Sequence, residues 1–144
     1  MNAVEQLMDE RIERLIEVIM PLPRIDLPTM SFLLEGMYLR QCCIPAGTAF
    51  VGRQHKKPHY FICAKGSAQI TVEGSIQLIK SGMVLLVEPG HKRAGVTVED
   101  TVFITVHRTS ETDLPAIEED LVVFDSRATY GINNALLHKL EEKL

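Results

Sequence analysis

Two histidines in the segment "GRQHKKPHYFICAKG" (residues 52–66) have the residue type and the spacing of metal ligands. On a straight strand, His55 and His59 would share a face but lie about 13 Å apart, too far for one ion with bonds to nitrogen of about 2 Å. Pro58 and the β-prone residues after it oppose a helix. If the chain instead reverses at residues 56–58, the two imidazoles face each other across a strand pair. The spacing therefore suits a metal only in a β-sheet fold.

The elements that must position these side chains are mostly short strands. Seven segments rich in β-branched and other apolar residues cover 37–44, 49–53, 59–64, 67–73, 75–80, 83–88 and 101–107. Glycines stand at 66, 74, 82 and 90, each eight residues after the last, and supply the backbone angles that tight turns need. This rhythm predicts a mostly β protein, an antiparallel sandwich or barrel over residues 36–108.

Helical segments flank the predicted barrel. Apolar residues recur every three or four positions in residues 1–20, which predicts an amphipathic helix. The run "PLPRIDLP" ends this helix, and we expect residues 21–35 to be a linker. Residues 109–144 read as an acidic helical turn, a final strand and a C-terminal amphipathic helix, "INNALLHKLEEKL".

Composition and charge narrow the class of function. The chain has 144 residues, enough for one domain with a core, and a net charge of −4. Residues 36–108 carry nine Lys and Arg against four Asp and Glu, too few and too scattered for a nucleic-acid surface. No apolar run approaches the length of a membrane span, and the acidic start differs from a signal peptide. We therefore expect a protein that is not secreted through a signal peptide and binds neither nucleic acid nor membrane.

The segment from about residue 44 to 107 resembles the cupin superfamily, the small RmlC-like β-barrels or jelly rolls. Its first motif usually places two histidines and a glutamate before a glycine, and here Arg53, His55 and His59 occupy those positions before Gly66. In the second motif, "GMVLLVEPGHKR", Arg93 stands where the family has its last histidine. The resemblance implies a single cupin-like antiparallel barrel with helices at both ends. Two of its four usual ligand positions hold histidine and two hold arginine.

A third histidine completes a candidate metal site. By strand alternation, His107 shares a face with Phe103 and Thr105 in "TVFITVH". If Phe103 points into the barrel, His107 does too, and His55, His59 and His107 form a three-histidine set for one divalent metal, Zn, Fe, Mn or Ni. This arrangement would make the protein a metal-dependent small-molecule enzyme.

The same segment supports a second interpretation, in which the barrel binds an anion. Arginine receives a carboxylate or phosphate through two parallel hydrogen bonds. The candidate anion-binding side chains are Arg53, Lys56, Lys57, Lys92 and Arg93. The sequence contains no nucleophile with an adjacent base, so this interpretation favours a binding module over an enzyme.

The sequence also resembles, more narrowly, the short single-cupin proteins of tailed bacteriophages and prophages. The segments that carry this likeness are "YLRQCCIPAGTAFVGRQHKKPHYFICAKG", "EPGHKR" and "EDTVFITVHRTSETDLPAIEEDLV". It implies a non-catalytic binding or structural module, located in the cytoplasm or in a virion. The strand "HYFICA" is apolar on both faces, so one face needs a cover outside the barrel. We therefore expect a homo-oligomer or a subunit of a larger assembly, held partly by the first twenty residues.

Overall fold

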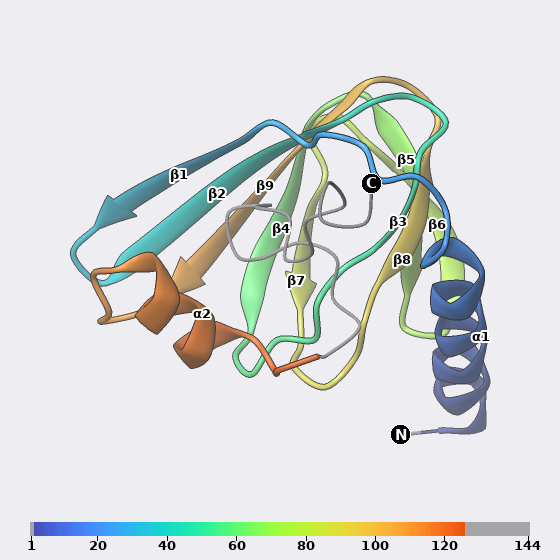
Figure 1. Cartoon of the computed structure of the whole chain (residues 1–144), viewed down its shortest axis with the longest axis horizontal. Helices are drawn as coiled ribbons and strands as arrows, with labels where there is room; N and C mark the ends of the chain where they lie inside the picture. Colours follow the sequence, from blue (N-terminus) through green and yellow to red (C-terminus); the bar gives the residue numbers. More distant parts are fainter. Residues whose placement is uncertain (1, 126–144) are drawn as a thin grey trace, which may run out of the picture.

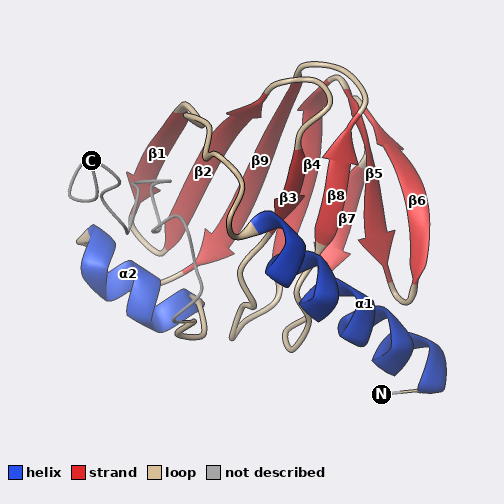
Figure 2. Ribbon diagram, turned by 45° about the vertical axis from the view of Figure 1, so that its right-hand side comes forward, coloured by secondary structure: helices blue, strands red, loops and turns tan. Residues whose placement is uncertain are grey.

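The computed structural model describes residues 2–125, which form nine strands and two helices (Figures 1 and 2). The helices are α1 (Ala3–Ile19) and α2 (Leu114–Leu121). The strands are β1 (Thr29–Leu34), β2 (Met37–Ile44), β3 (Ala49–Val51), β4 (His59–Lys65), β5 (Ser67–Val72), β6 (Ser75–Lys80), β7 (Val84–Val87), β8 (Ala94–Thr97) and β9 (Thr101–Arg108). Among these residues, no helix is long and apolar enough to cross a membrane.

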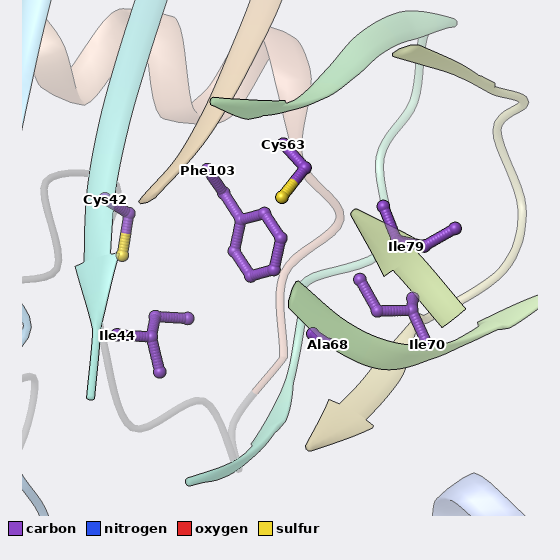
Figure 3. Close-up of a cluster of buried hydrophobic side chains, with 7 residues drawn as sticks. All are labelled: Cys42, Ile44, Cys63, Ala68, Ile70, Ile79 and Phe103. Atoms are coloured by element: carbon purple, nitrogen blue, oxygen red, sulfur yellow. The ribbon is translucent and has the colours of Figure 1, made fainter. Parts of the chain in front are cut away.

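Two antiparallel sheets make the sandwich that the strand rhythm predicts. One sheet has the order β1-β2-β9-β4-β7 and the other β3-β8-β5-β6. Side chains alternate along each strand, so every second residue points between the sheets. The inward residues at one end of the sandwich form an apolar core (Figure 3), consisting of Cys42, Ile44, Cys63, Ala68, Ile70, Ile79 and Phe103. The inward histidines His59 and His107 lie further along β4 and β9, toward the other end of the sandwich.

Two strands were not predicted. β1 lies within residues 21–35, which the sequence analysis treats as a linker. Its sequence "TMSFLL" lacks a clean alternation of apolar and polar residues, and five of its six residues are exposed at the sheet edge. β8 has only four residues, one of them glycine, so it carries little strand signal. Both strands are recognised through their partners, because β1 pairs with β2, and β8 pairs with β3 and β5.

Helix α1 packs on its own barrel. Asn2 and Glu5 form a capping box at its start, and its buried side chains Ile12 and Ile16 contact Ala94 of β8. Figure 2 shows the helix lying across the β3–β8 side of the sandwich. An intramolecular contact therefore covers part of the apolar stripe that the sequence shows, while Val4, Leu7 and Val18 remain exposed.

The C-terminal part of the prediction is partly met. The acidic turn is helix α2, whose first turn is capped by the Asp113 side chain accepting from the backbone N–H of Ala116 (3.0 Å). The predicted final strand is reduced to one bridge between Val122 and His55. The predicted C-terminal helix, residues 132–144, lies outside the described residues.

The outer face of the five-stranded sheet is apolar across its whole width. The register aligns one row of side chains, consisting of Phe32, Leu39, Val106, Tyr60 and Leu86. A neighbouring row consists of Met30, Gln41, Ile104, Ile62 and Val84. Phe32, Tyr60 and Leu86 are each about half exposed, at 48%, 53% and 54%. We call these two rows the outer apolar face.

The eight-residue glycine rhythm corresponds to turns with positive φ. Gly66 and Gly82 both have left-handed backbone angles, φ +82° and +94°, but their surroundings differ. A Cβ on Gly66 would overlap the carbonyl oxygen of Asp100 and lie 2.7 Å from Oγ1 of Thr101. A Cβ on Gly82 would meet nothing within 4 Å. Gly66 therefore serves both the turn and the close approach of the strand that leads into His107.

The pair Gly66→Ala and Gly82→Ala separates backbone strain from crowding. Both variants should lose about 1–2 kcal/mol of unfolding free energy because alanine disfavours the left-handed region. Gly66→Ala should lose about 1–3 kcal/mol more, the usual cost of overpacking. Urea unfolding monitored by circular dichroism measures both values. Equal losses for the two variants would contradict the close approach described at Gly66.

Candidate functional site

Three imidazole rings meet inside the open end of the sandwich. The ring centroids of His55 and His59 are 4.2 Å apart, those of His59 and His107 4.5 Å, and those of His55 and His107 5.2 Å. One nitrogen from each ring can be chosen so that all three lie within 4.8 Å of one another. His59 and His107 are buried, and His55 is partly buried. The structure thus brings together the three histidines that the sequence analysis proposes as one set.

Three different elements supply these rings. His59 is the first residue of β4 and pairs with Val87 of β7. His107 lies near the end of β9, where it pairs with Tyr38 of β2, and its ring is 5.8 Å from the tyrosine ring. His55 precedes the turn at residues 56–58. The chain reverses there and brings His55 beside His59, as expected. The expected hairpin is wrong, however, because β3 pairs with β8 in one sheet and β4 pairs with β7 and β9 in the other, so the two rings meet between the sheets and not across a strand pair.

Helix α2 and the residues after it hold the loop that carries His55. The backbone N–H of Lys56 donates to the carbonyl of Leu121 (2.8 Å), and that of Val123 donates to the carbonyl of Gln54 (2.9 Å). These two hydrogen bonds flank the bridge between His55 and Val122. Figure 1 shows α2, in orange, below the ends of β2 and β9. The segment from α2 to Val123 therefore fixes the position of the third histidine.

Three of the five candidate anion-binding side chains are engaged with this same segment. Arg53 donates to a carboxylate oxygen of Glu118 (3.1 Å) and to the carbonyl of Val123 (2.9 Å). Lys56 Nζ donates to the carbonyl of Glu119 (2.6 Å). Lys57 Nζ lies 2.8 Å from Oδ2 of Asp120, which also accepts from the hydroxyl of Thr109 (2.7 Å). The structure places Arg53, Lys56 and Lys57 as links between the loop and α2.

Lys92 and Arg93 lie on the opposite rim and differ from each other. Lys92 Nζ is 3.0 Å from a carboxylate oxygen of Glu13 in α1 and 3.2 Å from one of Asp125. Arg93 extends over the ring of Phe61, with Cζ 6.0 Å from the ring centroid. Of the predicted anion-binding set, Arg93 is thus the one that lies over an aromatic ring and, within residues 2–125, forms no ion pair.

A cavity of about 580 Å³ connects these groups. The three histidines and Arg93 line it together with Phe50, Phe61 and Phe103 from the apolar end. Residues of the α1–β1 connection also line it, among them Met20, Leu22, Arg24, Ile25 and Leu27. The cavity is large enough for a small organic molecule beside the histidines.

Burial and neighbouring positive groups keep the imidazoles neutral. Burial lowers the pKa of His55 to about 3, with further lowering by His59 and Arg40. Burial also lowers the pKa of His59 to about 4, with a contribution from the Arg93 guanidinium. For His107, burial and the other two histidines lower the pKa to about 2. Neutral imidazole is the form that binds a metal, so at pH 7 protons do not compete for these nitrogens.

The hydrogen bonds of the rings are compatible with metal binding. Nδ1–H of His55 donates to the carbonyl of Arg53 (3.0 Å), which leaves Nε2 as the free lone pair. Nε2 of His107 is hydrogen-bonded to Oγ1 of Thr105 (2.8 Å). Nδ1 of His59 is buried and, among the described residues, has no hydrogen-bond partner. A buried ring nitrogen of this kind is costly unless an ion, a water molecule or a ligand satisfies it.

Two neighbouring residues of the site were missed by the sequence analysis. Arg40 and Tyr38 line the cavity from β2, and the Tyr38 hydroxyl is hydrogen-bonded to that of Ser31 (2.9 Å). Both lie on the inward face of β2, the face that Cys42 and Ile44 also occupy. That alternation could have identified them, but the apolar run around residues 42–44 obscures it.

Comparisons with known proteins place the fold. No protein-family model matches the chain, and no curated protein sequence matches it. Among solved structures, a cupin superfamily protein from Desulfitobacterium hafniense is 13% identical, with a TM-score of 0.52 over 65% of this chain and 86% of its own. KdgF from Halomonas is 10% identical, with a TM-score of 0.50 over 58% of this chain and 81% of its own.

A third neighbour is the DMSP lyase DddQ from Ruegeria pomeroyi, which is 18% identical, with a TM-score of 0.52 over 60% of this chain and 49% of its own. At these identities the likeness concerns the fold and leaves activity open. The neighbours are cupin-domain proteins and include enzymes. The prediction of the fold class is confirmed, and the chain has a mostly antiparallel, cupin-like β-sandwich with two described helices.

Proposed function

We propose that this protein binds a divalent metal through His55, His59 and His107 and uses the site to bind a small molecule in the cavity beside it. The observation that carries the proposal is the convergence of three ligand nitrogens within 4.8 Å of one another at the end of a 580 Å³ cavity. Three protein ligands leave further coordination positions for water or for the small molecule, as in catalytic metal sites.

The residues have distinct roles in this proposal. The three imidazoles hold the metal, and the Arg53 carbonyl and Thr105 hydroxyl orient the rings of His55 and His107. Imidazole ligands suit Zn, Fe and Ni, and Mn also remains in the expected set. A metal held there would supply Lewis-acid polarisation of an oxygen of the bound molecule. This is the metal-dependent alternative of the sequence analysis, and the geometry favours it over an empty barrel.

Metal content tests the proposal directly. Protein purified without an affinity tag should carry about one equivalent of a divalent metal, measured by plasma mass spectrometry. His59→Ala should lower the metal affinity by more than the roughly 10- to 100-fold that outer-shell changes cost. His91→Ala is the control, because that ring is outside the cluster and pairs with Asp9 of α1. Wild-type protein that stays metal-free after incubation with Zn, Fe, Mn and Ni salts would refute the proposal.

The low pKa values of the three histidines predict acid sensitivity of the metal-free protein. Unfolded histidine has a pKa near 6.5, so below that pH the unfolded chain binds protons that the folded site rejects. Stability should therefore fall as the pH drops below about 6.5 and continue to fall toward pH 4. At pH 5.5 the loss should be on the order of 1 kcal/mol per histidine.

Urea unfolding of protein treated with a chelator, at pH 7.5 and pH 5.5, measures this loss. The double variant His55→Gln/His107→Gln should keep only about a third of it, since one of the three rings remains. Asp120, whose pKa is lowered by Lys57 and Thr109, loses its contribution only at more acid pH and does not interfere. A wild-type stability that is unchanged or higher at pH 5.5 would show that the rings are not held neutral.

A second candidate function is assembly, which the outer apolar face favours. Ten aligned residues on this face include no charged side chain, and Gln41 is their one strongly polar member. A second copy of the same face therefore meets no like charge, as a two-fold interface requires. The occupant that we propose is a second copy of this chain. A position in a virion remains a prediction from the phage resemblance.

Light scattering on the full-length chain tests this assembly. Wild type should have the mass of a dimer or a higher oligomer, and Leu86→Lys should shift it toward the monomer by burying a charge in the interface. Ile76→Lys is the matched control, because Ile76 is 65% exposed on β6 in the other sheet. A monomeric wild type at high concentration, or equal effects of the two variants, would assign the outer apolar face to a different partner or to none.

A further inference from the structure

Arg93 carries one of the buried, unsatisfied polar atoms of the cavity. Its Nη1 atom is buried and, within the described chain, has no hydrogen-bond partner. Burial lowers the pKa of Arg93, and the charge of Glu73 acts against this without an ion pair between the two side chains. Glu73 lines a second, smaller pocket next to α1, and Arg93 borders both this pocket and the main cavity. A buried guanidinium without an anion is unfavourable, because desolvation of the charge is not repaid.

The cavity as a whole carries more positive than negative charge. Five cationic side chains line it, namely Arg24, Arg40, Arg53, Lys92 and Arg93. Two carboxylates line it, and each already contacts one of these cations, Glu118 with Arg53 and Asp125 with Lys92. Counted over the described lining residues, five cations against two carboxylates give a formal charge of +3. A metal at the histidines would add to this excess, so the cavity calls for an anion.

The walls next to Arg93 are apolar and aromatic. Its guanidinium lies over Phe61, whose ring centroid is 4.7 Å from that of Phe103, and Phe103 is 5.8 Å from Phe50. Ile70 and Val87 extend the same wall. A strongly hydrated inorganic anion would lose its water against these surfaces without a replacement. A ligand with one anionic end and an apolar body matches both features.

We propose that the ligand of this cavity is a small organic acid, whose carboxylate is received by Arg93 and whose body packs between Phe50, Phe61 and Phe103. The inference deepens the proposed function by naming the class of molecule bound next to the three histidines. A bound metal should change only the affinity for the organic acid, because the groups that recognise the acid, Arg93 and the aromatic wall, belong to the protein itself. It also narrows the predicted anion-binding set to the one member over this wall.

Two pairs of probes isolate the carboxylate. Benzoate and benzamide have nearly the same shape, as do hexanoate and hexanamide, and inorganic phosphate provides an anion without an apolar body. Isothermal titration of the metal-free full chain should show binding of benzoate or hexanoate and at least 10-fold weaker binding of the matching amide and of phosphate. Arg93→Gln should weaken carboxylate binding by about 10- to 100-fold, the weight of a charge-assisted hydrogen bond.

Two further variants show whether a loss of carboxylate binding reflects the Arg93 side chain or misfolding. Arg93→Lys should retain part of the affinity, because it keeps the charge but loses the planar pair of donors. Arg108→Gln should bind like wild type, because Arg108 is exposed at the end of β9 and does not line the cavity. Circular dichroism and the melting temperature establish that each variant is folded before titration.

The metal dependence separates this inference from the proposed function. With Zn²⁺ loaded first, benzoate or hexanoate should bind more tightly, and by linkage each carboxylate should raise the Zn²⁺ affinity by the same factor. Carboxylate binding that requires Arg93 in a protein unable to bind metal would support the inference and refute the metal site. Metal binding with no preference for carboxylate over amide, or with equal carboxylate affinity in wild type and Arg93→Gln, would overturn the inference. A preference for phosphate would overturn it as well.

Discussion

The structure depends on holding three neutral imidazoles in one small buried volume. Protonation of any one ring would place a charge within about 5 Å of the other two, in partly desolvated surroundings that also hold Arg40 and Arg93. Because burial already lowers all three pKa values, the rings stay neutral at pH 7 with no carboxylate partner among residues 2–125. The same neutrality leaves one lone pair on each of the three rings, which line one cavity with a nitrogen of each within 4.8 Å of the others, the arrangement that a metal ion requires. Structure and proposed function therefore rest on one electrostatic condition.

The chain meets this condition by giving neighbouring cations different tasks. Arg53, Lys56 and Lys57 are drawn away from the rings by Glu118, the Glu119 carbonyl and Asp120 on the α2 side. These contacts fix the loop that carries His55. Arg93, in contrast, lies over Phe61 and lines the cavity. The positive charge that would oppose a metal is thus partly neutralised by the protein, and the rest is left for an anionic ligand in the proposal made above.

Much of this arrangement could be predicted from the sequence, because it follows from local rules. Strand alternation alone placed Phe103 and His107 on one face, and the turn at Pro58 brought His55 back toward His59. The contacts of Lys56 and Lys57 with α2 could not be predicted in this way. Their partners lie 63 residues further along the chain, and no local pattern links a lysine in a turn to an acidic helix at that distance. Strand β1 was missed for a related reason, since its apolar residues face solvent and only its pairing with β2 defines it.

The central claim is that His55, His59 and His107 ligate one metal ion, and X-ray absorption spectroscopy of Zn²⁺-loaded protein tests it most directly. The account predicts nitrogen neighbours at about 2.0–2.1 Å with the outer-shell scattering of three imidazoles. In His59→Ala, reloaded at high Zn²⁺, one imidazole contribution should be lost. A first shell of oxygen alone, or an imidazole signal that is the same in wild type and His59→Ala, would contradict the account.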